Sequence, residues 1–385
     1  MAVQLLERQA RIGSDDRRRS LLGVLRHLDV ILIGATLTLA GIGLVMVYSV
    51  TRGESTFVKH QFAYVVVGVA VMALVAVVDY RHLEEWGYLL YGAAILSLLG
   101  VRAIGSESTL GAQREINLGF FSLQPSEFAV LGLIMAVAVF VRTHEEELTP
   151  RRLAKLLSLA GAPMLLVLLQ PDLGTTLIMA MVLAVMLVIS GVRMRHLLLL
   201  ALVAAALGFI ALHAHLLPSY QVQRLGSFLH QDDPRYCSGP GTCYQLIESK
   251  TAIGAGGMRG TGLFAGALTN TGFVPYAYAD FIFSAVGEQL GFVGSGLVLG
   301  LFGLVSLRIF RAAQQARDSL GRLLCAGVLA FVVFSVFQNV GMSIGIMPIT
   351  GIPLPFISYG GSAIVAFFAA IGLVLNVELH RGGRR

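Results

Sequence analysis

The sequence contains little charge. Only 13% of its 385 residues are Asp, Glu, Lys or Arg, whereas 56% are hydrophobic, and the mean hydropathy is +0.78. An average soluble protein has about 25% charged residues, most of them on its surface. The composition therefore excludes an ordinary soluble globule and a separate soluble catalytic domain, and it predicts an integral membrane protein.

Cysteine and metal-ligand patterns are also scarce. The chain has three cysteines and no CxxC pair, and His213, His215 and His230 lack the spacing of metal ligands. Cys237 and Cys243 flank a turn-forming Ser-Gly-Pro-Gly-Thr in a segment that we expect outside the reducing cytosol. They are candidates for a disulfide, with two free thiols as the alternative.

Long apolar runs make up most of the chain. A helix needs about 20 apolar residues to cross the bilayer core. We predict an all-α integral membrane protein with about ten transmembrane helices, and one extracytoplasmic loop, 218–279, that is long enough to contain short helices. The ten predicted spans are 28–50, 59–79, 86–104, 124–141, 153–169, 172–192, 197–217, 280–307, 322–347 and 355–377.

The distribution of Lys and Arg predicts how the chain is oriented in the membrane. Twenty of the 28 Lys and Arg residues lie in the N-terminal head, the tail and every second loop, and basic loops stay in the cytoplasm. Both termini are therefore predicted to be cytoplasmic, with 1–27 as a basic segment, 28–379 as one membrane domain and 380–385 as a tail. We find no convincing cleavage site, so the first span is interpreted as a retained anchor. The sequence pI of about 9.4 indicates contact with anionic lipids and not with nucleic acid.

Four predicted spans begin with polar motifs, all on the outer side of the membrane. Unpaired N–H groups and the helix dipole favour an anion at such a helix start, so the motifs together predict a cradle for phosphate. The alternative is that these residues only begin and cap their helices. The residues concerned are Gln124, Ser126, Glu127, Asp172, Asp280, Ser358, Tyr359, Gly360, Gly361 and Ser362.

The second half of the long loop is rich in glycine. Gly256 and Gly257 lie in it, together with the cations Lys250 and Arg259. We expect the glycines to bring backbone close to a lipid-linked headgroup while the cations meet its phosphate. A solvated glycine-rich loop is the alternative.

Asp280, Ser284 and Glu288 follow one another at intervals of four residues. On a single helix they form one polar stripe, with Glu288 about 12 Å deeper than Asp280. A carboxylate at that depth needs a partner, so Ser284 and Glu288 are predicted to be structural polar groups within the membrane. A helix N-cap is the alternative role for Asp280.

Six motifs, taken in order, resemble the signature of the SEDS (shape, elongation, division and sporulation) family. The resemblance runs from Leu28 to about Leu379. Within the family, Leu28-Asp29 and the segment 339–342 are more similar to the rod-shape branch (RodA) than to the division branch (FtsW). The six motifs are QPSE at 124–127, QPDLG at 170–174, AIGAGG at 252–257, DFIF at 280–283, EQLG at 288–291 and PLPFISYGGS at 353–362.

The resemblance implies a peptidoglycan glycosyltransferase of the bacterial cytoplasmic membrane. Such an enzyme polymerises lipid II at the outer leaflet during cell elongation and releases undecaprenyl diphosphate. Its implied partners are a class B penicillin-binding protein that crosslinks the product and other membrane proteins of the elongation complex. The family's essential carboxylate maps onto Asp280, beside which a divalent cation, Mg or Mn, is an open expectation; no organic cofactor is expected.

Several positions depart from the family pattern. Tyr278 and Ala279 stand where His-Thr is common, and Tyr276 where Glu is common. Three further departures are Glu115, Val130 (in place of a Lys) and Glu248. The missing lysine suggests that Arg114, Lys250 or Arg259 supplies positive charge to the substrate site.

Three other functions remain open from the sequence. A lipid II flippase would also use broken helices and intramembrane carboxylates, although we see no strong internal repeat. A division-branch polymerase and a non-catalytic scaffold for a cell-wall synthase are the other two.

Overall fold

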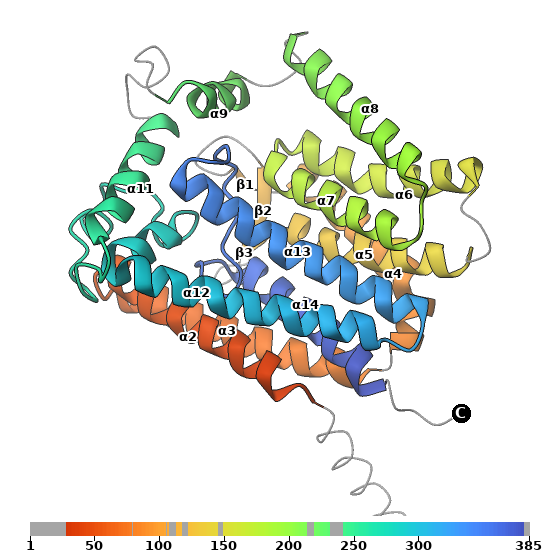
Figure 1. The fold of residues 1–385 in the computed structure, drawn as a ribbon, viewed down its shortest axis with the longest axis horizontal. Helices are drawn as coiled ribbons and strands as arrows, with labels where there is room; N and C mark the ends of the chain where they lie inside the picture. The colour runs from red at the N-terminus through yellow and green to blue at the C-terminus, as the bar shows by residue number, and fades with distance from the viewer. Residues whose placement is uncertain are drawn as a thin grey trace, which may run out of the picture.

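A computed structural model describes residues 28–78, 80–104, 106–107, 113–117, 122–144, 149–213, 219–231 and 242–380. Ten long helices form the bundle in this part of the chain, so the prediction of about ten transmembrane helices is confirmed (Figure 1). Seven are long and apolar enough to cross a membrane, and three contain shorter apolar stretches. The seven are α2 (Val30–Val50), α3 (Ser55–Val77), α5 (Pro125–Arg142), α6 (Pro150–Leu169), α12 (Ile282–Gln315), α13 (Ser319–Ile344) and α14 (Gly361–Leu379); the three are α4 (Tyr80–Ile104), α7 (Leu173–Ile189) and α8 (Met194–His213).

The connections contain smaller elements. The long loop carries the predicted short helices, α9 (Ser219–Leu229) and α11 (Thr242–Gly256). Between α4 and α5 lies a small antiparallel sheet of β1 (Ser106–Glu107), β2 (Gln113–Asn117) and β3 (Ser122–Leu123), in that order. We did not predict this sheet, because strands of two to five residues leave too short a pattern to recognise in a sequence.

Helices α5 and α14 form the centre of the bundle. In each, 89% of the most apolar stretch is buried inside the protein, against 33% for α3 and 28% for α6. Glycine permits close packing of α3 on α14, because a Cβ on Gly372 would lie 2.7 Å from the Met72 carbonyl oxygen. Helices α3 and α14 have no distinct polar face, so only the structure separates their core faces from faces left for lipid.

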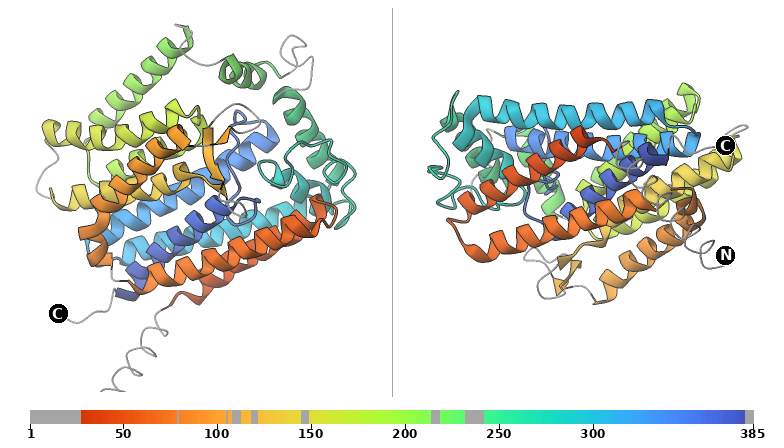
Figure 2. Two further views of the ribbon diagram at one scale, coloured as in Figure 1. Left: turned by 180° about the vertical axis from the view of Figure 1, so that it is seen from behind. Right: turned by 90° about the horizontal axis from the view of Figure 1, so that it is seen from below.

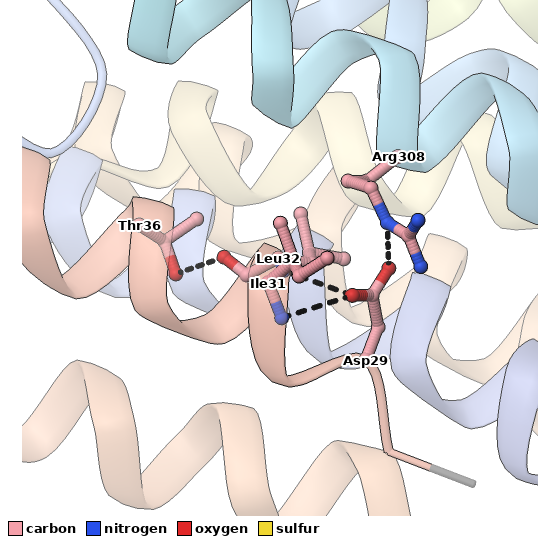
Figure 3. A network of polar contacts seen from close by, with 5 residues as sticks. All are labelled: Asp29, Ile31, Leu32, Thr36 and Arg308. Carbon is pink, nitrogen blue, oxygen red and sulfur yellow. Dashed lines mark hydrogen bonds and ion pairs between the residues drawn. The ribbon is translucent and has the colours of Figure 1, made fainter.

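Successive helices run in alternate directions. Helices α3, α5, α7 and α14 therefore all begin at the end of the bundle where α2 ends and α11 lies, which we call the loop end (Figures 1 and 2). At the opposite end, which we call the tail end, Asp29 caps α2 and pairs with Arg308 of α12 (Figure 3). The polar motifs expected on one side of the membrane are thus gathered at one end of the bundle.

Helix α12 is not one straight helix. Gly291 has φ 67° and ψ −165°, which breaks α12 into a short first part, 282–290, and a long second part, 292–315. The side chain of Gln289, in the first part, accepts a hydrogen bond from Ser49 Oγ (2.7 Å), one residue before α2 ends at Val50. The carbonyl oxygen of Asp280 instead accepts one from Asn339 Nδ2 (2.8 Å), within α13.

This break corrects one sequence-based prediction. Glu288 does not lie about 12 Å deeper than Asp280, because the first part of α12 runs back toward the loop end and does not descend into the bundle. The N-cap of α12, the alternative role considered for Asp280, is Phe281.

Candidate functional site

The turn that carries Asp280 is held from the other side by the segment 348–360. Asn339 Nδ2 donates to the carbonyl oxygens of Asp280 (2.8 Å) and Ile352 (2.7 Å), and so joins the two segments. Ser358 Oγ donates to the Ala279 carbonyl (2.6 Å), and the Tyr359 amide donates to the Tyr278 carbonyl (2.9 Å). These bonds fix the backbone on both sides of a half-buried carboxylate.

Glycine allows the segment 348–360 to approach that carboxylate. Gly351 has φ +73°, and a Cβ at this position would lie 3.2 Å from Asp280 Oδ2. Phe356, in the same segment, is also left-handed, with φ +63°, although it is almost fully buried. Strained residues of this kind persist where the surrounding structure determines them, often at functional sites.

A second cluster of polar side chains lies where α5 and α7 begin. Asp172 caps α7 by accepting from the Thr175 amide (3.1 Å) and hydroxyl (2.9 Å), and it accepts from Ser126 Oγ (3.4 Å). Gln124 Nε2 donates to that same Ser126 hydroxyl (3.2 Å). Glu127 is buried close enough to Asp172 for the two carboxyl groups to interact. Here the structure matches the capping alternative, because a carboxylate already occupies the N-terminus of α7.

The serines of the last motif make internal contacts. Ser358 Oγ accepts from the Leu354 amide (2.8 Å), and Ser362 Oγ accepts from the Gln124 amide (2.8 Å) and donates to the Ser122 carbonyl (2.7 Å). Both serines are buried. Gly360 is the N-cap of α14 and Gly361 its first residue. These residues therefore connect the start of α14 to the start of α5 and to the Asp280 turn.

Tyr278 and Tyr359 are part of an aromatic cluster beside Asp280. The Tyr278 ring lies 5.8 Å from that of Tyr359, 5.2 Å from Phe57 and 6.5 Å from Tyr276, measured between centroids. Burial, followed by Tyr276 and Asp280, raises the pKa of Tyr278 above its ordinary value. Burial also raises the pKa of Tyr359, and Tyr64 and Tyr278 add to that shift. Both phenols are therefore neutral hydrogen-bonding groups at neutral pH.

A cavity of about 510 Å³ lies against this cluster. One wall is formed by Arg52 and Glu54 in the turn between α2 and α3 and by Phe57 at the start of α3. The other wall is the segment 269–278, with Tyr276 and Tyr278. We did not identify Arg52, Glu54 or Phe57 as site residues from the sequence. The available signal was an Arg-Gly pair in a very short connection that we expected on the outer side.

Glu288 and Ser284 have protein partners, in accordance with a structural role. Glu288 accepts from the Leu268 amide (2.8 Å) and from the Thr269 amide (2.9 Å) and hydroxyl (2.6 Å). Ser284 Oγ lies 2.6 Å from Ser249 Oγ. The fully buried Glu288 carboxylate thereby holds the segment that forms one wall of the cavity.

The glycine-rich part of the loop packs on α12. A Cβ on Gly256 would lie 2.0 Å from the Gly287 carbonyl oxygen, whereas Gly257, with φ +53°, borders open space. Lys250 Nζ donates to Gln231 Oε1 (3.1 Å), and Arg259 is exposed. Close approach of Gly256 thus serves contact with protein backbone.

Some predicted site residues fall wholly or partly outside the described residues. Arg114 is in β2, but its side chain is not described. Cys243 is disulfide-bonded, while Cys237 lies outside the described residues.

The fold and this site define a class: a multi-pass helical membrane protein with a polar, partly aromatic site around one carboxylate at one end of its bundle. A model of the cell cycle protein family of FtsW, RodA and SpoVE matches residues 29–382, and the chain belongs to this family. The predicted SEDS membership is confirmed.

Individual relatives agree along nearly the whole chain. Peptidoglycan glycosyltransferase MrdB of Escherichia coli (strain K12) is 34% identical over 356 residues, which cover 92% of this chain and 94% of MrdB. Stage V sporulation protein E of Bacillus subtilis (strain 168) is 34% identical over 365 residues, 91% of this chain and 97% of that protein.

Solved structures share the fold. The rod shape determining protein RodA of Thermus thermophilus superimposes with a TM-score of 0.70 at 29% identity, over 93% of this chain and 98% of that one. A chain from a solved peptidoglycan synthase complex, described as coordinating polymerization and crosslinking, gives a TM-score of 0.79 at 30% identity, over 93% of this chain and 99% of that one. The predicted likeness to the rod-shape branch is confirmed by these matches to RodA and MrdB.

Proposed function

We propose that this protein is a peptidoglycan glycosyltransferase that polymerises lipid II into glycan strands during cell elongation and releases undecaprenyl diphosphate. One observation carries the proposal: Asp280 is a half-buried carboxylate whose backbone is held on both sides by the segment 348–360. The name of the relative MrdB, a peptidoglycan glycosyltransferase, supports the same activity.

Asp280 acts as the general base. The 4-hydroxyl of the acceptor sugar attacks the anomeric carbon of the donor, and the bond to the diphosphate breaks with its electron pair leaving on the diphosphate oxygen. A positioned base that accepts the hydroxyl proton typically contributes 10²- to 10⁴-fold to the rate. The hydrogen bonds to Ala279, Asp280 and Tyr278 hold the base in one position and so reduce the entropic cost of alignment.

The departing diphosphate needs positive charge. Lys250 and Arg259 are the candidate cations among the described residues, and Arg114 is a further candidate from the sequence. No group of three or more His, Cys, Asp or Glu side chains gathers in the described part of the chain. A Mg or Mn ion at Asp280 would thus share one protein carboxylate with substrate phosphates and water, as Mg²⁺ commonly does, and would stabilise the leaving charge.

An apolar cavity supports a lipid-linked substrate. It measures about 420 Å³, lies among α3, α4, α5 and α14, and is lined by side chains such as Leu90, Phe128 and Leu373. Its lining also includes Leu123 and Pro125, which flank Gln124 of the polar cluster at the start of α5 and α7. A prenyl chain in this cavity would bring its diphosphate to the loop end of the bundle.

Location and partners follow from the same proposal. We place the loop end outside the bacterial cytoplasmic membrane and both termini in the cytoplasm, with 28–379 as one membrane domain. A class B penicillin-binding protein would crosslink the product, in keeping with the coordination of polymerization and crosslinking in the related synthase complex.

The test is polymerisation by the purified protein with its partner bound and crosslinking blocked. Asp280→Asn should lower the rate by about 10²-fold or more, because the base is lost while the shape of the side chain is kept. Glu248→Gln, the same chemical change in the long loop, should keep the rate of the unchanged protein. Normal polymerisation by folded Asp280→Asn would overturn the proposal, and adding a chelator in parallel tests the metal.

A lipid II flippase is a second candidate, favoured by the broken helix α12. Labelled lipid II that crosses the bilayer of proteoliposomes, with no polymer formed under any condition, would support this function over the first.

A further inference from the structure

Two adjoining cavities lie at the loop end, apart from the apolar cavity. The first, of about 510 Å³, is bounded by the α2–α3 turn and the segment 269–278. The second, of about 570 Å³, is lined by Tyr48, Ser49, Gly53 and Phe264. The two share Arg52, Asn270 and Thr271 as lining residues. Each is within the range of about 300–1,000 Å³ that is usual for small-molecule sites.

Their walls concentrate backbone strain. Five non-glycine residues have positive φ in the described part of the chain, and three of them line these cavities: Arg52 (54°), Phe264 (66°) and Tyr276 (54°). For bulky side chains this conformation is uncommon and costs free energy. Such strain persists only where the surrounding contacts determine it, so the walls of these cavities have a defined shape.

The lining of the first cavity determines what it can bind. Phe57, Tyr276 and Tyr278 contribute aromatic surface, and Tyr276 is 43% exposed. Arg52 and Glu54 add one charge of each sign, so the wall has no net charge to select an anion. Aromatic surface with a few polar groups suits a neutral pyranose, whose C–H faces pack on rings while its hydroxyls form hydrogen bonds.

The first cavity lies close in the chain to the proposed catalytic residue, Asp280. Tyr278 lines the first cavity and stands two residues before Asp280. A sugar held against Tyr276 and Tyr278 would thus lie next to the turn that carries Asp280. Two cavities in succession offer room for more than one sugar ring.

We propose that these two cavities form a saccharide subsite that binds N-acetylhexosamine rings; the identity of the sugar rests on the proposed function. The rings belong either to a growing glycan strand or to the lipid-linked precursor, which share the same chemistry. Tyr276 provides the main stacking surface, and Arg52, held by its hydrogen bond to the Asn270 carbonyl, separates the two cavities.

Direct binding tests the subsite without catalysis. The probe is a short soluble oligomer of N-acetylglucosamine, its binding to the full detergent-purified chain measured by saturation-transfer NMR. The unchanged protein and Asp280→Asn should both bind it. Tyr276→Ala should weaken binding by about tenfold or more, since the stacking surface is lost. Tyr276→Gly removes the same ring while relieving the positive φ, so a loss of binding in both variants is not due to misfolding.

The matched control is Tyr88→Ala on α4, where a tyrosine of similar exposure, 45%, lies outside both cavities. It should bind the oligomer like the unchanged protein. Unaltered binding by folded Tyr276→Ala and Tyr276→Gly would overturn the subsite, and so would failure of the unchanged protein to bind.

Polymerisation assays separate the two sources of the sugar. If the occupant is the glycan strand, adding preformed strands should accelerate the unchanged protein but not Tyr276→Gly. If it is the precursor, the variant should show a KM for lipid II raised about tenfold or more, with no effect of added strands. Absence of polymerisation by the unchanged protein would defeat the proposed function while the NMR result still decides the subsite.

Discussion

At the scale of single residues, several buried polar side chains at the loop end bind backbone. Ser358, Ser362 and Asn339 connect segments that lie far apart in the sequence, and Glu288 holds the segment at 268–269. Such bonds are valuable inside a bundle, because a buried polar group without a partner is costly. The polar motifs of this chain thus partly reflect architecture and not only chemistry.

Thr269→Val tests the role of Glu288. The change removes the hydroxyl that donates to the carboxylate at 2.6 Å and should lower the free energy of unfolding by about 1.5–3 kcal/mol. Thermal unfolding in detergent measures it. Thr271→Val, at an exposed threonine bonded only to its own turn, is the control and should change stability by less than about 0.5 kcal/mol. Equal stability of the two variants would contradict this role.

The raised pKa of Tyr278 and of Tyr359 predicts a pH dependence. In the unfolded chain both phenols ionise near pH 10, whereas in the folded protein they retain their protons to higher pH. The folded state then binds more protons, so stability is complete below about pH 10 and is lost as pH rises through the folded values.

Tyrosinate absorbance during an alkaline titration measures this. Tyr278→Phe and Tyr359→Phe should each remove one of the last groups to ionise and reduce the loss of stability at high pH. If Tyr278→Phe or Tyr359→Phe instead removes a tyrosine that ionises near pH 10, the pKa of that phenol is not raised in the folded protein.

At the scale of elements, the break in helix α12 has the largest effect on the shape of the site. Its apolar sequence extends across Gly291 without interruption, so we predicted one straight span at 280–307. The break depends on close contact, because Gly260 and the Arg259 backbone lie where a Cβ on Gly291 would be. Long-range contacts of this kind leave no local pattern, in contrast to the helix starts at Pro125 and Pro150, which the sequence marks.

Gly291→Ala should therefore be strongly destabilising. Its Cβ would lie 2.2 Å from the Gly260 nitrogen, and alanine at φ +67° adds about 1–3 kcal/mol of strain. We expect a marked fall in the thermal midpoint and in the amount of folded protein, measured by fluorescence-detected size exclusion. Gly296→Ala in the same helix meets nothing within 4 Å and should fold normally. Comparable folding of both variants would refute the break at Gly291.

At the scale of the whole molecule, the tail end of the bundle is joined by an ion pair. Arg308 Nε donates to Asp29 Oδ2 (2.5 Å), while Asp29 Oδ1 accepts from the amides of Ile31 and Leu32 (Figure 3). The pair connects the start of α2 to the second part of α12. Asp29 is almost fully buried, so loss of its partner leaves a buried charge.

Arg308→Ala should lower the free energy of unfolding by about 1.5–3 kcal/mol. Arg311→Ala, which removes an exposed arginine one turn further along α12, should have little effect. Thermal unfolding of both variants and of Asp29→Asn provides the measurement. Additive effects of Asp29→Asn and Arg308→Ala in the double variant would show that the two residues do not interact.

The sequence alone determined the class, the number of long helices and the end of the bundle at which the polar motifs gather. These features depend on local composition: an apolar run of sufficient length forms a helix in a membrane, and successive helices must alternate in direction. Only the tertiary structure decided that α12 turns back at Gly291, that Glu288 supports a loop, and that Arg52 and Tyr276 face one cavity. Each depends on contacts between residues far apart in the chain, and in a uniformly apolar sequence no periodicity records which faces meet.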